Sequence, residues 1–249
     1  LSGCINAKYN RIQFTPDLLP ADITGSEIYV AAKGELEFRK GPVFANLVLA
    51  DEINRAPAKV QSALLEAMAE RQVSMGGRRY QLPELFMVMA TQNPIEHEGT
   101  YNLPEAQLDR FLMYIKIDQP DAESERKILH LVRGEEGACG EDISCWQDKD
   151  KKFQALDIAD ILAARQEVLK VHMSEPIEEY LVQLIMATRQ PEKYDGKLAN
   201  QVMFGASPRA TIALDRCAKI NAWLSGRDFV TPEAVSYTHL RAHETGRNL

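Results

Sequence analysis

Two runs of consecutive apolar residues stand out along the chain, and each ends in polar side chains. Residues 47–50 lead into Asp51 and Glu52, and residues 85–90 lead into a polar turn that reaches Asn93. Apolar runs without alternation are typical of strands buried on both faces of a parallel sheet. The segment between the two runs repeats apolar residues at helical spacing. We therefore predict a right-handed strand–helix–strand unit whose polar strand ends lie side by side.

Turn residues and residue spacing predict the elements around this unit. Strands are predicted at residues 11–15 and 114–117, and hairpins over residues 28–44 and 73–82, the second turning at Gly76-Gly77. Asn54 is predicted to cap the helix of the central unit, with Pro57 in the first turn of that helix.

The pattern changes near residue 119. Beyond this point helical spacing recurs without convincing strands, and one helix is predicted to begin at Ser207-Pro208 and to end at Gly226. We therefore divide the chain into an α/β domain over residues 1–119 and an all-α domain over residues 120–235.

The polar strand ends form the candidate site. In open α/β sheets, ligands bind outside the carboxyl ends of the strands, which is where Asp51, Glu52 and Asn93 are expected. In a phosphoryl-transfer site a strand-end Asp holds Mg²⁺ and a neighbouring group positions the attacking water. The amide of Asn93 would orient that water or contact a phosphate. The alternatives are an ordinary solvated acid pair and an asparagine that caps its own turn.

Composition is that of an ordinary globular protein. Of 249 residues, 45% are hydrophobic and 26% charged, which suffices for one large domain or two. The net charge of −7 argues against a protein that coats nucleic acid or an anionic membrane. The four cysteines include no C-x-x-C pair, so neither a zinc site nor a disulfide framework is indicated. Since the sequence has no apolar run of about 18 residues and no signal peptide, we expect a soluble cytoplasmic protein with reduced thiols.

Six stretches of the sequence resemble the MoxR-type AAA+ ATPases, in order and with that family's spacing. They are RIQFTPDLLPADITG (11–25), ADEINRAP (50–57), QSALLEAMAERQ (61–72), ATQNPIE (90–96), GTYNLPEAQLDRF (99–111) and GASPRA (205–210). The resemblance spans roughly residues 8–235 and is far more specific than any single motif. It implies a P-loop NTPase core of the AAA+ type, followed by an all-α lid domain.

The resemblance implies a role for each of five residues. Asp51 resembles the Walker B ligand of Mg²⁺, Glu52 resembles the residue that activates water, and Asn93 resembles sensor 1. Arg110 is similar to the arginine finger that reaches the nucleotide of the neighbouring subunit. Arg209 resembles sensor 2, which contacts the γ-phosphate in cis, although by itself it would be interpreted as an ordinary surface arginine.

The resemblance also implies cofactors and partners. These are ATP and Mg²⁺, further copies of the chain in a ring that is usually a hexamer, and client proteins, with von Willebrand factor A-domain proteins as candidates. The segments around residues 27–39 and 73–82 resemble the helix-2 insert and the pre-sensor hairpin, which face substrate. The implied function is ATP hydrolysis that remodels or assembles partner proteins.

One departure from the family concerns the phosphate-binding loop. The motif G-x-x-x-x-G-K-[ST] is absent, since the only Gly-Lys pair is Gly196-Lys197, which Leu198 follows. Residues 1–10 resemble the end of the helix that follows this loop. We therefore expect an N-terminal truncation that removes a central strand, leaves ladder groups unpaired along a gap in the sheet, and makes the fragment inactive.

A second departure is residues 236–249, which do not continue the closing helix of the family. We expect them to be a non-native tail. His239 and His243 are four residues apart, but no third metal ligand is near them in the sequence.

Two other functions are weighed against the ATPase. One is a non-catalytic AAA+-fold module that docks partner proteins through its hairpins. The other is a nucleic-acid motor, which the acidic balance and the lack of a basic stripe disfavour. The sequence that precedes Leu1 separates the first two, because an intact phosphate loop indicates the ATPase and a degenerate loop indicates the module.

Overall fold

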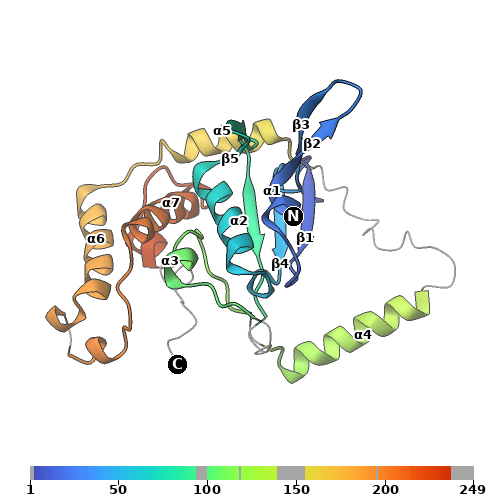
Figure 1. Cartoon of the computed structure of the whole chain (residues 1–249). Coiled ribbons are helices and arrows are strands. Elements are labelled where there is room, and N and C mark those ends of the chain that lie inside the picture. The colour runs from blue at the N-terminus through green and yellow to red at the C-terminus, as the bar shows by residue number, and fades with distance from the viewer. Residues whose placement is uncertain (1–2, 94–99, 118, 139–154, 195, 237–249) are drawn as a thin grey trace.

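A three-stranded parallel sheet forms the centre of the N-terminal half (Figure 1). The computed structural model describes residues 3–93, 100–117, 119–138, 155–194 and 196–236. The sheet has the order β1–β4–β7 and consists of β1 (Tyr9–Gln13), β4 (Leu47–Asp51) and β7 (Met87–Ala90). Both strand pairs are parallel, with Gln13 opposite Asp51 and Ala50 opposite Ala90. The prediction that the two polar strand ends lie side by side is therefore confirmed.

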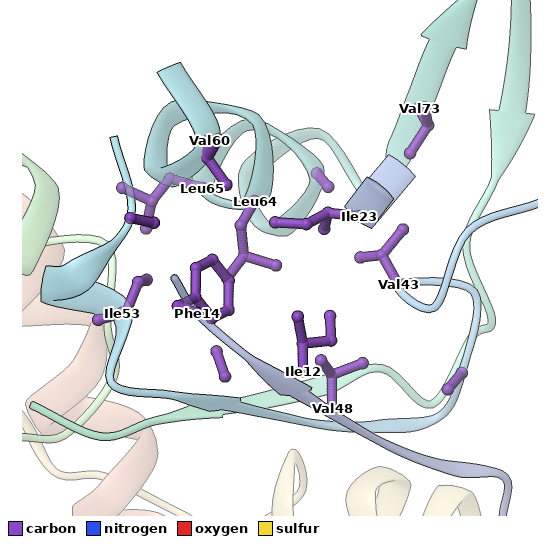
Figure 2. Close-up of a cluster of buried hydrophobic side chains, with 14 of the residues drawn as sticks. Ile12, Phe14, Ile23, Val43, Val48, Ile53, Val60, Leu64, Leu65 and Val73 are labelled. Atoms are coloured by element: carbon purple, nitrogen blue, oxygen red, sulfur yellow. The ribbon is translucent and has the colours of Figure 1, made fainter. Parts of the chain in front are cut away.

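Helix α2 (Ala58–Glu70) packs on this sheet through the apolar face that its sequence repeats. Val60, Leu64 and Leu65 are buried, and Figure 2 shows them gathered around Phe14 and Ile53. Removing these side chains from water is the main term that stabilises the packing of the helix on the sheet. The core thereby sets where β4 ends relative to the start of α2.

Asn54 does not cap α2, so that prediction is wrong. Asn54 lies in the 3₁₀ turn η1 (Ile53–Arg55), and Pro57 takes the N-cap position of α2. Because η1 turns the chain before α2 begins, the Asn54 side chain is buried and donates to the carbonyl oxygen of Asn93 instead.

Two further expectations about strands are also wrong. In β7, Met87 and Met89 are 39% and 45% exposed, so this strand is not buried on both faces. Residues 114–117 form no strand, and Ile115 and Ile117 are 74% and 90% exposed. A strand requires a hydrogen-bonded neighbour, and within the described residues β7 pairs with β4 alone.

The two predicted hairpins are present and lie against each other. One joins β2 (Gly25–Val30) to β3 (Glu35–Lys40), and the other joins β5 (Gln72–Met75) to β6 (Arg78–Gln81). Gly76 and Gly77 both have positive φ, +56° and +73°, as the tight turn between β5 and β6 requires. The rings of Phe38 and Tyr80 stack with their centroids 4.1 Å apart, which joins the two hairpins.

The second half is helical in its described parts. Its helices include α4 (Ala122–Ala138), α5 (Ile158–Val168), α6 (Glu175–Arg189) and α7 (Pro208–Leu224), with the 3₁₀ turns η3 (Pro191–Lys193) and η4 (Leu198–Asn200) and a further helical segment at residues 232–236. The first half also contains the short helices α1 (Pro20–Thr24) and α3 (Glu105–Leu108). Ser207 caps α7 as predicted, because its hydroxyl accepts from the backbone N–H of Arg209.

Two separate hydrophobic cores support the division into two domains. One core lies between the sheet and α2, and the other joins α6 and α7 through residues such as Leu181 and Leu214. Helix α4 extends away from both (Figure 1). The boundary at residue 119 stays a prediction. Residues 237–249, which include most of the predicted tail with His239 and His243, lie outside the described residues.

No helix in the described part of the chain combines the length and the apolar character that crossing a bilayer requires.

Candidate functional site

The turn after β4 and the turn after β7 meet at the carboxyl edge of the sheet. The hydroxyl of Thr91, directly after β7, donates to Asp51 Oδ1 at 2.5 Å and accepts from the backbone N–H of Glu52 at 2.9 Å. Asn54 Nδ2 donates to the carbonyl oxygen of Asn93 at 3.2 Å. The structure therefore joins the turn that carries Asp51 and Glu52 to the segment that carries Asn93, through Thr91 and Asn54.

Asp51 is held as a carboxylate by two neighbours. The hydrogen bond from Thr91 and the ion pair with Arg11, whose Nη2 lies 2.5 Å from Asp51 Oδ2, lower the pKa of Asp51 below its usual value. The bond from Thr91 contributes most to this shift. Asp51 therefore stays ionised to a lower pH than an ordinary aspartate, and a ligand for a cation must be ionised.

Glu52 is oriented by side chains on either side of it. Gln13 Nε2 donates to Glu52 Oε2 at 2.9 Å, and Arg55 Nη1 lies 2.9 Å from the same oxygen. The backbone of Glu52 has φ 56° and ψ 49°, the left-handed conformation that residues other than glycine rarely adopt. Such a conformation costs ~1 kcal/mol or more and persists only where the surrounding structure imposes it.

The donor atoms at this edge suit a magnesium ion. The carboxylate of Asp51 and the hydroxyl of Thr91 are oxygen ligands of the kind Mg²⁺ takes. The guanidinium of Arg11 already pairs with Asp51, so a cation that binds Asp51 would compete with this ion pair. Across the residues that the structure describes, no three His, Cys, Asp or Glu side chains form a metal cluster. A Mg²⁺ ion here would therefore depend on substrate phosphates and water for its other ligands.

The structure places Arg110 and Arg209 together, away from the two acids. Arg110 Nη1 donates to the carbonyl oxygen of Leu65, two turns along α2, at 3.0 Å. Arg209 Nη1 lies 3.8 Å from Asp109 Oδ2, and Ser207 donates to the other oxygen of Asp109 at 2.5 Å. Both arginines line a pocket of about 300 Å³ on the flank of α2.

This second pocket has a mixed charge. Glu66 and Glu70 of α2 line it together with the two arginines and Gln107. The oxygen Oε1 of Gln107 is buried and has no hydrogen-bond partner among the described residues. Neither Arg110 nor Arg209 contacts Asp51 or Glu52 in the hydrogen bonds and ion pairs of the described chain. The predicted site residues thus form two separate groups.

Sequence reasoning missed four side chains at the strand ends: Arg11, Gln13, Arg55 and Thr91. A usable signal existed for two of them, since Arg11 and Gln13 are two apart on a predicted strand and so share a face. Their partners could not be identified, because the parallel register of β1 on β4 places Gln13 opposite Asp51 only in the folded chain.

Two family profiles match the chain. Residues 1–113 match the ATPase family associated with various cellular activities (AAA), and residues 198–238 match the AAA lid domain. The first match contains the strand-end acids, and the second contains Arg209.

Individual proteins match over nearly the whole chain. Chaperone MoxR1 of Mycobacterium tuberculosis is 45% identical over 232 residues, which cover 93% of this chain and 58% of MoxR1. Protein MoxR of Methylorubrum extorquens is 33% identical over 251 residues, covering 93% of this chain and 68% of that protein. A solved structure from Cytophaga hutchinsonii superposes with a TM-score of 0.80 at 44% identity, covering 96% of this chain and 69% of the other.

The chain therefore spans about three fifths of the length of MoxR1 and about two thirds of the other two proteins. Three observations agree with one another: the order of the two profile matches, the fold, and the identity of the named relatives. The chain belongs to the MoxR-type family of AAA+ ATPases.

Proposed function

We propose that the protein binds Mg²⁺-ATP and hydrolyses it to remodel or assemble partner proteins. The proposal rests on the hydrogen bonds between two neighbouring turns. Thr91, after β7, bonds to Asp51 and Glu52 at the end of β4, and Asn93 is bonded through its backbone to the same turn. An ionised carboxylate for a cation is followed directly by a second carboxylate, and the backbone of Asn93 is tied to the same turn; a phosphoryl-transfer site needs a cation ligand and a group that positions water. The kinship with a protein named as a chaperone supports the remodelling role.

Each strand-end residue has a distinct task in this proposal. Asp51 holds the magnesium ion, and Thr91 and Arg11 keep it ionised. Glu52 accepts the proton of the attacking water, with Gln13 and Arg55 orienting its carboxylate. Magnesium, when bound, neutralises charge on the phosphates.

The third predicted catalytic group is Asn93, which orients the water or contacts the γ-phosphate in this proposal. Its backbone is tied to the turn of Glu52 through Asn54. This hydrogen bond holds the backbone of Asn93 at a fixed position relative to the turn of Glu52. An in-line attack requires the groups around the reacting atoms to be fixed in this way.

Arg110 and Arg209 act in this proposal across a subunit interface in a ring, which we take to be a hexamer. Their shared pocket on the flank of α2 supports this pairing, because neither arginine contacts the acids of its own subunit. We expected Arg209 to act in cis. Its position beside Asp109 and Arg110 favours instead that it serves the same neighbouring nucleotide as Arg110.

Client proteins would bind at the paired hairpins. Ile28, Tyr29 and Leu36 are exposed there, and apolar side chains exposed together mark interaction surfaces. Partners with von Willebrand factor A domains are part of this proposal through the family alone. The same observation supports the second candidate function, a module that docks proteins through the hairpins without hydrolysing ATP.

The test separates binding from hydrolysis and uses the protein expressed from its complete gene, because the 249 residues contain no phosphate-loop motif. Glu52→Gln should bind ATP at near wild-type affinity but hardly hydrolyse it, since the amide keeps the shape and removes the base. Asp51→Ala should weaken Mg²⁺-nucleotide binding as well. Equal loss of binding in both variants would contradict the distinct roles.

Two further measurements decide between the ATPase and the module. The isolated 249-residue chain should show no turnover above its own Glu52→Gln variant, because no backbone cradle for the β- and γ-phosphates is in its sequence. If the complete protein binds clients but neither binds nor hydrolyses ATP, the module is the better description.

A further inference from the structure

A buried glutamine of α2 joins the turn after β4, which follows Glu52, to Tyr101 in the chain beyond β7. Gln61 is 1% exposed, and its amide nitrogen lies 3.1, 3.2 and 2.9 Å from the carbonyl oxygens of Ile53, Ala56 and Tyr101. Because all three neighbours are acceptors, only the NH₂ end of the amide can face them. Ile53 and Ala56 flank the turn after β4, whereas Tyr101 follows Asn93 by eight residues.

Asn54 makes a second set of contacts between the same two segments. Its side chain donates to the carbonyl oxygen of Asn93 at 3.2 Å, and its own carbonyl oxygen accepts from the backbone N–H of Tyr101 at 2.6 Å. Asn54 is buried as well. The segment after β7 is thus fastened to the turn after β4 at both Asn93 and Tyr101.

The turn that Gln61 binds is the one that contains the left-handed residue Glu52. On its N-terminal side, Thr91 accepts from the N–H groups of Glu52 and Ile53, with its hydroxyl and its carbonyl oxygen respectively, at 2.9 and 3.0 Å. On its C-terminal side, Gln61 donates to the carbonyl oxygens of Ile53 and Ala56. A strained backbone of this kind is maintained by contacts from both sides.

We propose that Gln61 is a positioning residue that fixes the carboxylate of Glu52 relative to Asn93. It does so through the backbone, from a buried place in which it does not reach substrate. The inference rests on the proposed function only in that Glu52 and Asn93 act on ATP. An apolar side chain of equal length would fill the same space but leave carbonyl groups without donors, and the two turns would separate to reach water.

The test replaces Gln61 by methionine in the protein expressed from its complete gene and compares it with Val43→Ala. Val43 is buried in the same core, and Figure 2 shows it on the far side of the cluster from Ile53. Both variants should lower Tm by several degrees. Only Gln61→Met should lower kcat, by about tenfold or more with KM within about twofold, because a displaced catalytic group slows the chemical step.

A second readout needs no nucleotide. Hydrogen exchange at the backbone amides of Ile53 and Tyr101 should be faster in Gln61→Met than in Val43→Ala, since these amides lie in the joined segments. This measurement stays decisive if the wild-type protein fails to hydrolyse ATP, an outcome that would defeat the proposed function alone. If Gln61→Met does not fold, Gln61→Asn, whose amide is one methylene shorter, should show the same pattern.

Two results would overturn the inference. One is that Gln61→Met and Gln61→Asn lower kcat no more than Val43→Ala does at a similar loss of Tm. This result would make Gln61 a purely structural residue. The other is unchanged exchange at Ile53 and Tyr101 in these variants.

Discussion

Arg11 of β1 forms an ion pair diagonally across the strand pair with Asp51 of β4, its Nη2 2.5 Å from Asp51 Oδ2. Arg11 also donates to Gln13 Oε1 at 3.3 Å, and Gln13 donates to Glu52 at 2.9 Å. Two side chains on one face of β1 therefore hold the acid that ends β4 and the acid that follows it. A cation that binds Asp51 has to displace this guanidinium or share the carboxylate with it.

Replacing Arg11 by alanine should raise the affinity of the site for a divalent cation. The Arg11 side chain is well exposed, so the competing ion pair is weak and the gain should be no more than about fivefold. Titration with Mn²⁺, followed by electron paramagnetic resonance, measures the cation affinity of the two proteins. Lys33→Ala, which breaks an exposed pair with Glu37 on the β2–β3 hairpin, is the control. A weaker Mn²⁺ affinity in Arg11→Ala would contradict this competition and show instead that Arg11 holds the Asp51 carboxylate in its binding position.

The pKa of Asp51 should rise when Thr91 is replaced by valine, because the hydrogen bond from Thr91 is the largest cause of its lowered value. A carboxyl whose pKa is depressed on folding stabilises the fold above its unfolded pKa, and this contribution disappears as the pH falls through the folded pKa. Thr91→Val should thus be less stable than wild type at neutral pH, with the gap closing in acid. Carbon NMR of the Asp51 carboxyl and thermal melts test this. Thr91→Ser should restore the wild-type behaviour.

Arg110→Ala should be nearly inactive in the complete protein, since arginine fingers are worth ~10³ or more in rate. Glu52→Gln should be inactive for a different reason. Mixing the two variants before assembly creates interfaces where an intact Glu52 faces an intact Arg110, and these should regain ATPase activity. Mixed rings that form and stay inactive would reject action in trans.

The same mixing experiment decides how Arg209 acts. Because Arg209 lies beside Asp109 and lines one pocket with Arg110, Arg209→Ala mixed with Glu52→Gln should also regain activity. Action in cis predicts no recovery in this mixture. Mixing Arg209→Ala with Arg110→Ala provides the control, because two arginines that serve one interface cannot complement each other fully.

The stacked rings of Phe38 and Tyr80 should couple the two hairpins. A double-mutant cycle with leucine at each position should give a coupling free energy of about 0.5–1.5 kcal/mol, the usual value for an aromatic pair. Urea unfolding of the four proteins measures it. Phe38 also contacts Phe44 edge to face, so the cycle of Phe38 with Phe44 calibrates the result. Strict additivity at Phe38 and Tyr80 would mean that the hairpins are not coupled through these rings.

Local sequence determined most of the elements and one group of site residues. Consecutive apolar residues predicted β4, helical spacing predicted α2, and Gly76-Gly77 predicted the β5–β6 hairpin, because each depends on neighbours in the chain. Asp51 and Glu52 could be assigned to a strand end for the same reason. Residues 114–117 could not be judged in this way, since a strand exists only when another strand lies beside it.

Tertiary structure alone decided which side chains meet. The register of β1 on β4 sets Arg11 and Gln13 against the acids, and packing of α2 on the sheet buries the amide of Gln61 between two turns. The place of Arg209 also follows from folding, because Ser207 at the start of α7 binds Asp109, a residue 98 positions away in the chain. Sequence patterns report the periodicity of single elements, whereas contacts over such separations depend on how the elements pack.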